Sequence, residues 1–311
     1  MTWARDGGAK WMSRLPPTVT ARSIRELKIP GSHDSAAFEL FISMKCATDN
    51  SNVVQFIGNN LPPSRRIIRR WAITQHLPIL DQLNLGIRYL DLRVSRSICG
   101  QAPYRMVHTL FGHALETIFD SVKQFLDENL EEFVILDINH VYSMRGDADI
   151  DTIIDLIHGK FGKWRLCPPM DLAGITLDYL RESKYQLIVL MSECDFKEEE
   201  TRIWCQQRIR SPYANTNKLD RLFPYIEERL KHSSHARLHV TQGILTPRFA
   251  DIFKGLFVPG ASLETRLADN CTQTTVEWIQ RKKMDIDFNI VICDFVEKFG
   301  YCETVIEMNY E

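Results

Sequence analysis

The stretch "LGIRYLDLRV", residues 85–94, decides the fold class of this chain. It is a short apolar run that ends in Asp91 and Arg93, and side chains two apart on a strand share one face. A helical pattern comes directly before it, and further short β-type runs follow, separated by helical stretches. Because strands and helices alternate in this way, the sequence predicts an α/β protein with a mostly parallel sheet.

The same alternation continues along all 311 residues, and we find no repeat and no long linker. A doubly wound sheet is the alternative, but neither of its glycine fingerprints, GxGxxG and GxxxxGK[ST], is present. We therefore predict a TIM-type (β/α)8 barrel, irregular or partly open, at 22–311, preceded by an N-terminal extension at 1–21. The predicted strands are 24–29, 87–94, 105–108, 133–139, 186–191, 237–241 and 288–294, and the predicted helices are 64–85, 113–130, 149–160, 216–231 and 262–283.

Composition narrows the class of protein. The net charge of -2 argues against a globally basic nucleic-acid binder. No apolar stretch approaches the ~18 residues of a membrane-spanning helix, and the N-terminus lacks the apolar core of a signal peptide. Eight cysteines without a CxxC pair indicate reduced, buried thiols, so we expect a cytoplasmic protein.

Most of the predicted strands end in polar residues that can carry chemistry. In a barrel of this type the carboxyl ends of the strands meet at one rim, where catalytic residues lie. We therefore expect these side chains to converge, while His140 should face away from Asn139 because neighbours on a strand alternate. The polar ends are His33 and Asp34 in "LKIPGSHDSAAF" (27–38), Asp91 and Arg93, His108 in "YRMVH", Asp137 and Asn139 in "FVILDINH", and Asp294 in "NIVICD".

Two histidines from different strands indicate a paired general base and general acid near neutral pH. Asp294, on the closing strand, could hold His33, and either Asp34 or Asp91 could serve His108. Arg93 offers a fixed fork of donors that suits a phosphate group. The combination predicts in-line phosphoryl transfer.

At this point the sequence resembles a known family. The segments "IPGSHDSAAF", "QLNLGIRYLDLRV", "RMVHTLFG", "FVILDINHVY" and "IVICDF" resemble the X domain of phosphatidylinositol-specific phospholipase C, and above all the small PI-PLC X domain-containing proteins. The resemblance implies a phosphoric diester hydrolase that cleaves phosphatidylinositol-type lipid to diacylglycerol and cyclic inositol phosphate. It also implies a peripheral place at the membrane surface and a part in lipid degradation and signal transduction.

The resemblance implies a role for each catalytic position. His33 would be the general base that takes the proton of the inositol 2-hydroxyl, and Asp294 would orient it. His108 would be the general acid that protonates the leaving oxygen, assisted by Asp34. Arg93 would bind the phosphate.

The resemblance also bears on metal and inositol. Asp91 matches an acidic site position, and Asn139 is a candidate inositol contact. Calcium-dependent relatives carry asparagine after the first histidine and Glu-x-Asp on the second strand, whereas this chain has Asp34 and Asp91-x-Arg93. Calcium takes six to eight oxygen ligands, and a guanidinium offers none. We therefore expect no metal and no cofactor, with calcium disfavoured.

Two other functions are alternatives to this one. The first is a catalytically weak lipid-binding scaffold on the same barrel, which would not need the acid–base pair. The second is a metal-dependent glycerophosphodiesterase, which would want an early His-Arg pair. For the membrane surface, "SRRIIRRW" (64–71) is either an interfacial helix that inserts Ile67, Ile68 and Trp71 or a solvated helix packed on the barrel.

Overall fold

The structure is a computed structural model that describes residues 7–49, 51–97, 102–193, 195–231, 234 and 236–310. One curled, mostly parallel sheet forms its centre, in the order β7-β6-β5-β2-β1-β10-β9-β8, and the hairpin strands β3 and β4 continue antiparallel from β2. The strands are β1 (Ile29–Ser32), β2 (Tyr89–Arg96), β3 (Tyr104–His108), β4 (Leu110–Ala114), β5 (Val134–Tyr142), β6 (Leu187–Met191), β7 (Trp204–Cys205), β8 (Ile209–Arg210), β9 (Leu238–Gly243) and β10 (Ile290–Cys293).

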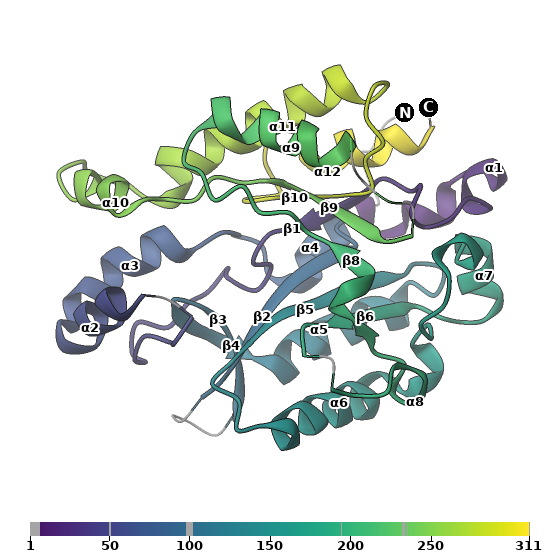
Figure 1. The fold of residues 1–311 in the computed structure, drawn as a ribbon, viewed down its shortest axis with the longest axis horizontal. Coiled ribbons are helices and arrows are strands. Elements are labelled where there is room, and N and C mark those ends of the chain that lie inside the picture. The colour runs from purple at the N-terminus through teal and green to yellow at the C-terminus, as the bar shows by residue number, and fades with distance from the viewer. Residues whose placement is uncertain are drawn as a thin grey trace.

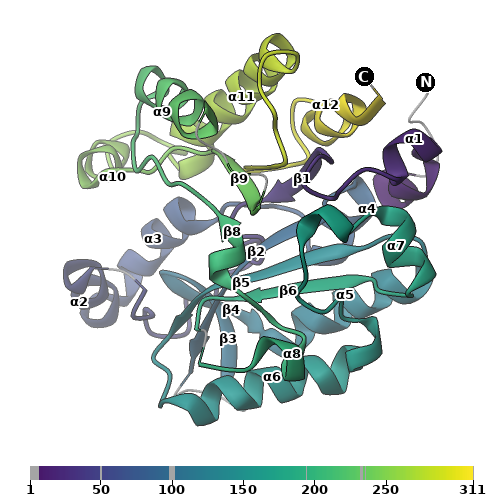
Figure 2. The same cartoon turned by 45° about the vertical axis from the view of Figure 1, so that its right-hand side comes forward.

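Helices surround the sheet, as Figures 1 and 2 show. The α-helices are α1 (Pro17–Thr20), α2 (Asn52–Asn60), α3 (Arg65–Ala72), α4 (Ile79–Leu85), α5 (Leu115–Glu128), α6 (Asp147–Phe161), α7 (Leu177–Glu182), α8 (Glu198–Thr201), α9 (Leu219–Lys231), α10 (Phe249–Gly255), α11 (Asp269–Lys282) and α12 (Tyr301–Glu307). Short turns of other helix types are η1 (Gly7–Lys10), η2 (Met12–Arg14), η3 (Pro62–Ser64), η4 (Lys163–Arg165), η5 (Leu172–Gly174), η6 (Gln206–Arg208), η7 (Glu264–Ala268) and η8 (Met308–Tyr310).

The barrel is open between β7 and β8, so the fold predicted from the sequence is confirmed in its irregular form. Both strands have only two residues, and no ladder joins them within the described part of the chain. The outward side chains of the sheet pack beneath α4, α5, α6, α9, α11 and α12 in one large core. The inward side chains, such as Tyr89, Ile135 and Ile292, fill the barrel as a second core.

The first barrel strand differs from the predicted 24–29, because it runs from Ile29 to Ser32 and includes Pro30 and Gly31. It pairs in parallel with β10 on one side and β2 on the other. A Cβ at Gly31 would lie 2.8 Å from Tyr89 Cδ1 and 2.9 Å from Ile292 Cγ2. At Gly31 the side chains of Tyr89 and Ile292 therefore come close to the backbone of β1, and the strand does not end at this glycine.

The predicted helix at 64–85 is two helices, α3 and α4, separated by 73–78. Pro78 is the N-cap residue of the second helix, a position where its missing N–H breaks no intrahelical hydrogen bond. The sequence analysis also missed α1, α2, α7, α8, α10 and α12, together with the short strands β4, β7 and β8.

The N-terminal residues 7–20 pack against the amino end of the barrel. Trp11 is 1% exposed, and its Nε1 donates to Gly86 O at 2.9 Å. Arg88 donates to Gly8 O and Ala9 O. This segment therefore covers the end of the barrel opposite to the strands' carboxyl ends, on the side where both termini lie in Figure 1.

The cysteines follow the prediction of reduced thiols only in part. Five of them are buried free thiols in the described residues, namely Cys46, Cys167, Cys271, Cys293 and Cys302. Cys205 departs from the prediction, because it is disulfide-bonded. Among the described helices, none is both long enough and apolar enough to cross a membrane.

Candidate active site

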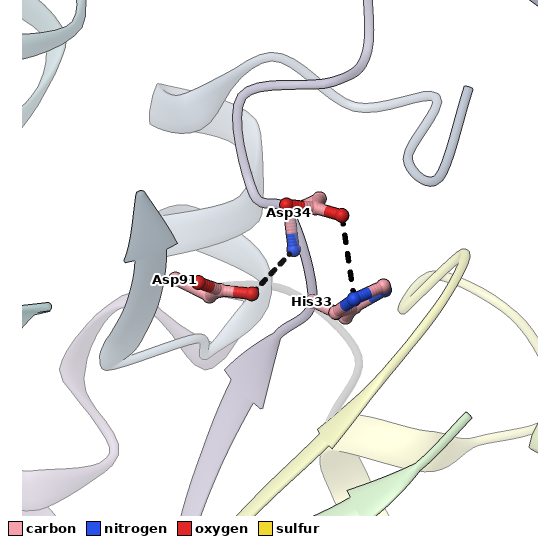
Figure 3. Close-up of side chains that lie close together, drawn as sticks. All are labelled: His33, Asp34 and Asp91. Atoms are coloured by element: carbon pink, nitrogen blue, oxygen red, sulfur yellow. Dashed lines mark hydrogen bonds and ion pairs between the residues drawn. The ribbon is translucent and has the colours of Figure 1, made fainter. Parts of the chain in front are cut away.

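Polar side chains from separate strands meet at the carboxyl end of the barrel. His33 and Asp34 follow β1 directly, Asp294 follows β10 directly, and Asp91 points inward from β2. Figure 3 shows Asp91 and His33 on either side of Asp34. The backbone N–H of Asp34 donates to Asp91 Oδ2 at 3.0 Å, which fixes the loop after β1 to the second strand.

His33 is held by two carboxylates. Its Nδ1 lies 2.7 Å from Asp294 Oδ1, and its Nε2 lies 3.3 Å from Asp34 Oδ2. Burial of the ring disfavours its charge, but the two carboxylates outweigh burial and raise the pKa of His33 to about 9. The substrate-free protein therefore holds His33 protonated near neutral pH.

His108 reaches the same space from a different direction than the sequence suggested. Its strand β3 is antiparallel to β2, with Met106 opposite Val94, so the hairpin brings His108 back down to the rim. Its Nδ1 donates to Ala72 O at 2.7 Å, and its Nε2 faces the site, 3.3 Å from Asp34 Oδ2. The ring centroids of His33 and His108 are 6.4 Å apart.

Asp34 lies between the two histidines. Its Oδ2 is 3.3 Å from Nε2 of His33 and 3.3 Å from Nε2 of His108, and its Oδ1 is 2.5 Å from Arg93 Nε. Burial opposes its ionisation, but Arg93 and both imidazoles outweigh burial and lower the pKa of Asp34. Its φ of 39° is in the left-handed region that a non-glycine residue adopts only when its surroundings require it.

Three of these residues could be read as a metal site. His33, Asp34 and Asp91 each offer a ligand atom, and the three atoms lie within 4.8 Å of one another. The Arg93 side chain contacts all three: Nε is 2.5 Å from Asp34, and Nη2 is 3.3 Å from His33 Nε2 and 3.9 Å from Asp91 Oδ2. Because a guanidinium carries fixed charge and no lone pair, this group of residues fits a divalent cation poorly.

Arg93 is itself fixed by this arrangement. Burial opposes its charge, but Asp34 and Asp91 outweigh burial and raise the pKa of Arg93 above its ordinary range. The guanidinium is thus a permanent positive charge beside both histidines.

Asn139 contacts the site through Asp91, since its Nδ2 donates to Asp91 Oδ1 at 2.6 Å. The expectation that His140 faces away from Asn139 is wrong. The register between β2 and β5 shifts here, so that Leu92 pairs with Ile138 and Arg93 with His140. This bulge places an extra residue at the rim, and His140 Nδ1 contacts Asn139 Oδ1.

Asp137, by contrast, lies deeper in the barrel. The hydroxyl of Tyr89 donates to its Oδ2 at 2.5 Å, and burial raises the pKa of Asp137 to about 7. Gln206 Nε2 also donates to Asp137 Oδ2, at 3.3 Å, so this buried carboxyl belongs to the barrel interior.

Sequence reasoning missed the residues that hold the catalytic loop, because they lie in the break between α3 and α4. Gln75 Nε2 donates to His33 O at 2.9 Å and to Cys293 O at 3.1 Å, and its Oε1 accepts from Val296 N. Thr74 Oγ1 donates to Asp34 O at 3.0 Å. Polar residues next to a proline in an otherwise helical pattern were the available signal.

Asp49 was missed as well. Its Oδ2 accepts the backbone N–H of Thr109 at 2.7 Å, which fixes the turn directly after His108. Thr109 has a φ of 62°, so this contact stabilises a strained backbone beside the second histidine.

A cavity of about 560 Å³ adjoins the histidines. His33, Arg93, His108 and Asp294 line one end of it. The rest of its lining is mostly apolar and comes from α2, α3 and the segment 244–263, which contains α10. In Figures 1 and 2 these helices gather at the end of the molecule opposite to the termini.

The chain was compared with known proteins. No family model matches it. It is 31% identical over 305 residues to PI-PLC X domain-containing protein 2 of Mus musculus, covering 97% of this chain and 87% of that protein. The chain belongs to the PI-PLC X domain-containing protein family.

A second relative has a similar sequence, and two solved structures have a similar fold. This PI-PLC X domain-containing chain is 28% identical over 309 residues to PI-PLC X domain-containing protein 3 of Homo sapiens, covering 97% of this chain and 94% of that protein. Its fold is similar to that of phosphatidylinositol-specific phospholipase C from Listeria monocytogenes, with a TM-score of 0.66, 15% identity, and coverage of 97% of this chain and 98% of that one. A Staphylococcus aureus phospholipase C of the same specificity also matches, with a TM-score of 0.66, 16% identity, and the same 97% and 98% coverage.

Proposed function

We propose that this protein is a phosphoric diester hydrolase that cleaves phosphatidylinositol-type lipid by acid–base catalysis between two histidines. One observation carries the proposal. A single anionic oxygen, Asp34 Oδ2, lies 3.3 Å from Nε2 of both His33 and His108. Two imidazole nitrogens that reach one anionic group from two sides are what a phosphodiester between a nucleophile and a leaving group requires.

In this proposal His33 Nε2 takes the proton of the inositol 2-hydroxyl, and that oxygen attacks the phosphorus. The bond from phosphorus to the glycerol oxygen breaks, and His108 Nε2 gives its proton to the leaving oxygen. The products are diacylglycerol and an inositol 1,2-cyclic phosphate. Water can then open the cyclic ester, with His108 as the general base and His33 as the general acid.

The remaining side chains support these two. Asp294 holds His33 through Nδ1, which leaves Nε2 as the atom that exchanges the proton. Arg93 provides fixed charge for the phosphate oxygens, in the position where a metal-dependent enzyme would hold a cation. Asp91 and Asn139 lie next to this charge and are the proposed contacts on the inositol side.

We also propose that the protein binds the membrane surface through the rim around the cavity. Apolar side chains are exposed there on α2, at the start of α10 and just after α10: Phe56 is 69% exposed, Phe249 66% and Phe257 75%. Of the two alternatives for α3, a helix packed on the barrel fits Trp71 better than an inserting helix, since Trp71 is 6% exposed and packs in a core with Ala261 and Leu263. Large exposed apolar side chains beside a site that acts on lipid fit an interfacial surface.

The deciding experiment is turnover of phosphatidylinositol vesicles by the wild type, followed as released inositol phosphate. His33→Ala and His108→Ala should each abolish turnover and still bind the vesicles. A scaffold makes the opposite prediction for the wild type, namely vesicle binding without any product, and that result would refute the enzymatic proposal.

The rim is tested by vesicle sedimentation with Phe56→Ser plus Phe257→Ser. Loss of each apolar side chain should weaken partition into vesicles about tenfold or more, since burying such a side chain contributes about 1.5–3 kcal/mol. Leu130→Ser is the matched control, because Leu130 is 71% exposed but lies at the start of the turn before β5, away from the rim. Equal partition of all three proteins would contradict the proposed surface.

A further inference from the structure

The charged and imidazole side chains that line the cavity next to the histidines lie at one end, and the rest of the lining is mostly apolar with the hydroxyl side chains Ser51, Ser64, Tyr213 and Thr246 among it. Its catalytic end is lined by His33, Arg93, His108 and Asp294. Beyond them its wall is built from apolar side chains of three segments, which we call the apolar wall: Val54 and Ile57 of α2, Ile67 and Trp71 of α3, and Ile252 and Leu263 of the segment 244–263.

The position of the apolar wall relative to the two histidines is informative. Thr109, which follows His108, lines the cavity, and so does Ala72, whose carbonyl accepts from His108 Nδ1. Asp91 and Asn139 do not line it. The cavity therefore adjoins both histidines, including the proposed general acid His108, but does not reach the proposed inositol contacts Asp91 and Asn139.

We infer that this cavity binds the acyl-glycerol part of the lipid substrate, so that one fatty acyl chain leaves the bilayer and lies against the apolar wall during catalysis. The inference rests on the proposed function, in which the group that His108 protonates is the diacylglycerol oxygen. A leaving group on that side must occupy the space that begins at His108, and in this protein that space is apolar.

The size of the cavity suits this occupant. A water molecule takes about 30 Å³ of liquid. A cavity of about 560 Å³ therefore has room for roughly 18 groups of that size, which covers a glycerol unit and much of one acyl chain. A free inositol phosphate would leave the apolar wall uncovered.

The side chains of the apolar wall are held in place by close packing behind them. Trp71 is 6% exposed and packs in one core with Ala261 and Leu263, itself 3% exposed. A Cβ at Gly255 would come within 2.6 Å of Trp71 Cζ2, so α10 and α3 meet closely behind the cavity. Side chains nearer the opening, such as Phe253 at 52% and Leu256 at 47%, are exposed and continue the wall towards the rim.

The test uses phosphatidylinositols with two acyl chains of four, six or eight carbons, assayed as monomers below their aggregation concentration so that no bilayer takes part. Each methylene that enters the cavity should raise kcat/KM about fourfold, from about 0.8 kcal/mol per buried methylene. A series that is flat in chain length, with measurable turnover, would overturn the acyl cavity and leave the proposed function standing.

Two variants locate the effect. Ile57→Trp places a larger side chain in the cavity and should collapse the ratio of kcat/KM between the eight-carbon and four-carbon substrates towards one. Val53→Trp is the matched control on the same helix, because Val53 is 60% exposed and does not line the cavity, and it should keep the wild-type ratio. If Ile57→Trp kept the wild-type ratio of kcat/KM between the two substrates, the acyl chain would have to bind outside this cavity.

A binding measurement separates this inference from the proposed function. A short-chain phosphatidylinositol with bromine on one acyl chain should quench Trp71 fluorescence in His108→Ala, and the quenching should vanish in His108→Ala with Trp71→Phe. If Trp71 is quenched but the wild type shows no turnover, the proposed hydrolase activity is refuted and acyl binding in the cavity is supported. If no quenching depends on Trp71, the inference that an acyl chain binds in this cavity is refuted, whether or not the wild type turns over substrate.

Discussion

Replacing Asp294 by asparagine should change both the rate and its dependence on pH. Asp294 Oδ1 lies 2.7 Å from His33 Nδ1, and the side chain of Asp294 is 2% exposed and that of His33 12%. Opposite unit charges about 4 Å apart attract by ~4 kcal/mol at an effective dielectric constant near 20, and one pKa unit corresponds to about 1.4 kcal/mol. Removing the charge should therefore lower the pKa of His33 from about 9 to near its ordinary 6.5 or below.

The assay is kcat/KM for a soluble phosphatidylinositol as a function of pH, which reports the free enzyme. In the wild type, kcat/KM should rise with pH towards about 9, because the general base must be neutral. Asp294→Asn should move that rise to lower pH and reduce the maximal rate, though less than the about 10²–10⁴-fold that loss of a general base costs.

Asp285→Asn is the matched control, since Asp285 is an exposed aspartate shortly before β10. It should leave rate and pH dependence as in the wild type. A wild-type rate and an unmoved profile in Asp294→Asn would refute the pairing of Asp294 with His33.

The remaining predictions concern the histidines, the arginine and stability. His33→Ala and His108→Ala should each lower turnover by about 10²–10⁴-fold with near-native circular dichroism, and retention of a tenth of the wild-type rate by either would reject its role. Wild-type activity on vesicles should survive excess chelator, whereas Arg93→Asp should be slow in chelator; a wild-type rate that falls to background and returns only with calcium would refute the arginine argument. Because the pKa of His33 is raised from 6.5 to about 9, its ionisation should stabilise the fold by up to about 3 kcal/mol below pH 6.5, and this contribution should disappear as pH rises through 9; urea unfolding should show that slope in the wild type and lose it in His33→Ala.

Local sequence pattern was enough to predict the barrel and most of its strands. Strand and helix periodicity survive in the sequence because each strand must bury both faces and each helix one face. Elements of two residues, such as β7 and β8, leave no periodicity to read, so the opening of the barrel could be expected only in general terms.

The position of His108 at the rim was predicted correctly, but the strand that carries it there is not the kind of strand that was predicted. The sequence analysis expected it at the rim as the end of a barrel strand. It reaches the rim instead on β3, an antiparallel hairpin strand that pairs with the upper part of β2. Strand direction depends on which partner a strand finds, and a run of five residues carries no signal for that choice.

By itself, the sequence determined the residue types of the site and the strands that carry them, because a titratable side chain after an apolar run is a local property. Only the tertiary structure decided their partners: Asp34 between two imidazoles, Arg93 in contact with every candidate metal ligand, and Gln75 joining β1 to β10. These contacts join residues up to 218 positions apart along the chain. Such pairings depend on the register of neighbouring strands and the path of the loops between them, so they arise only when the whole barrel has packed.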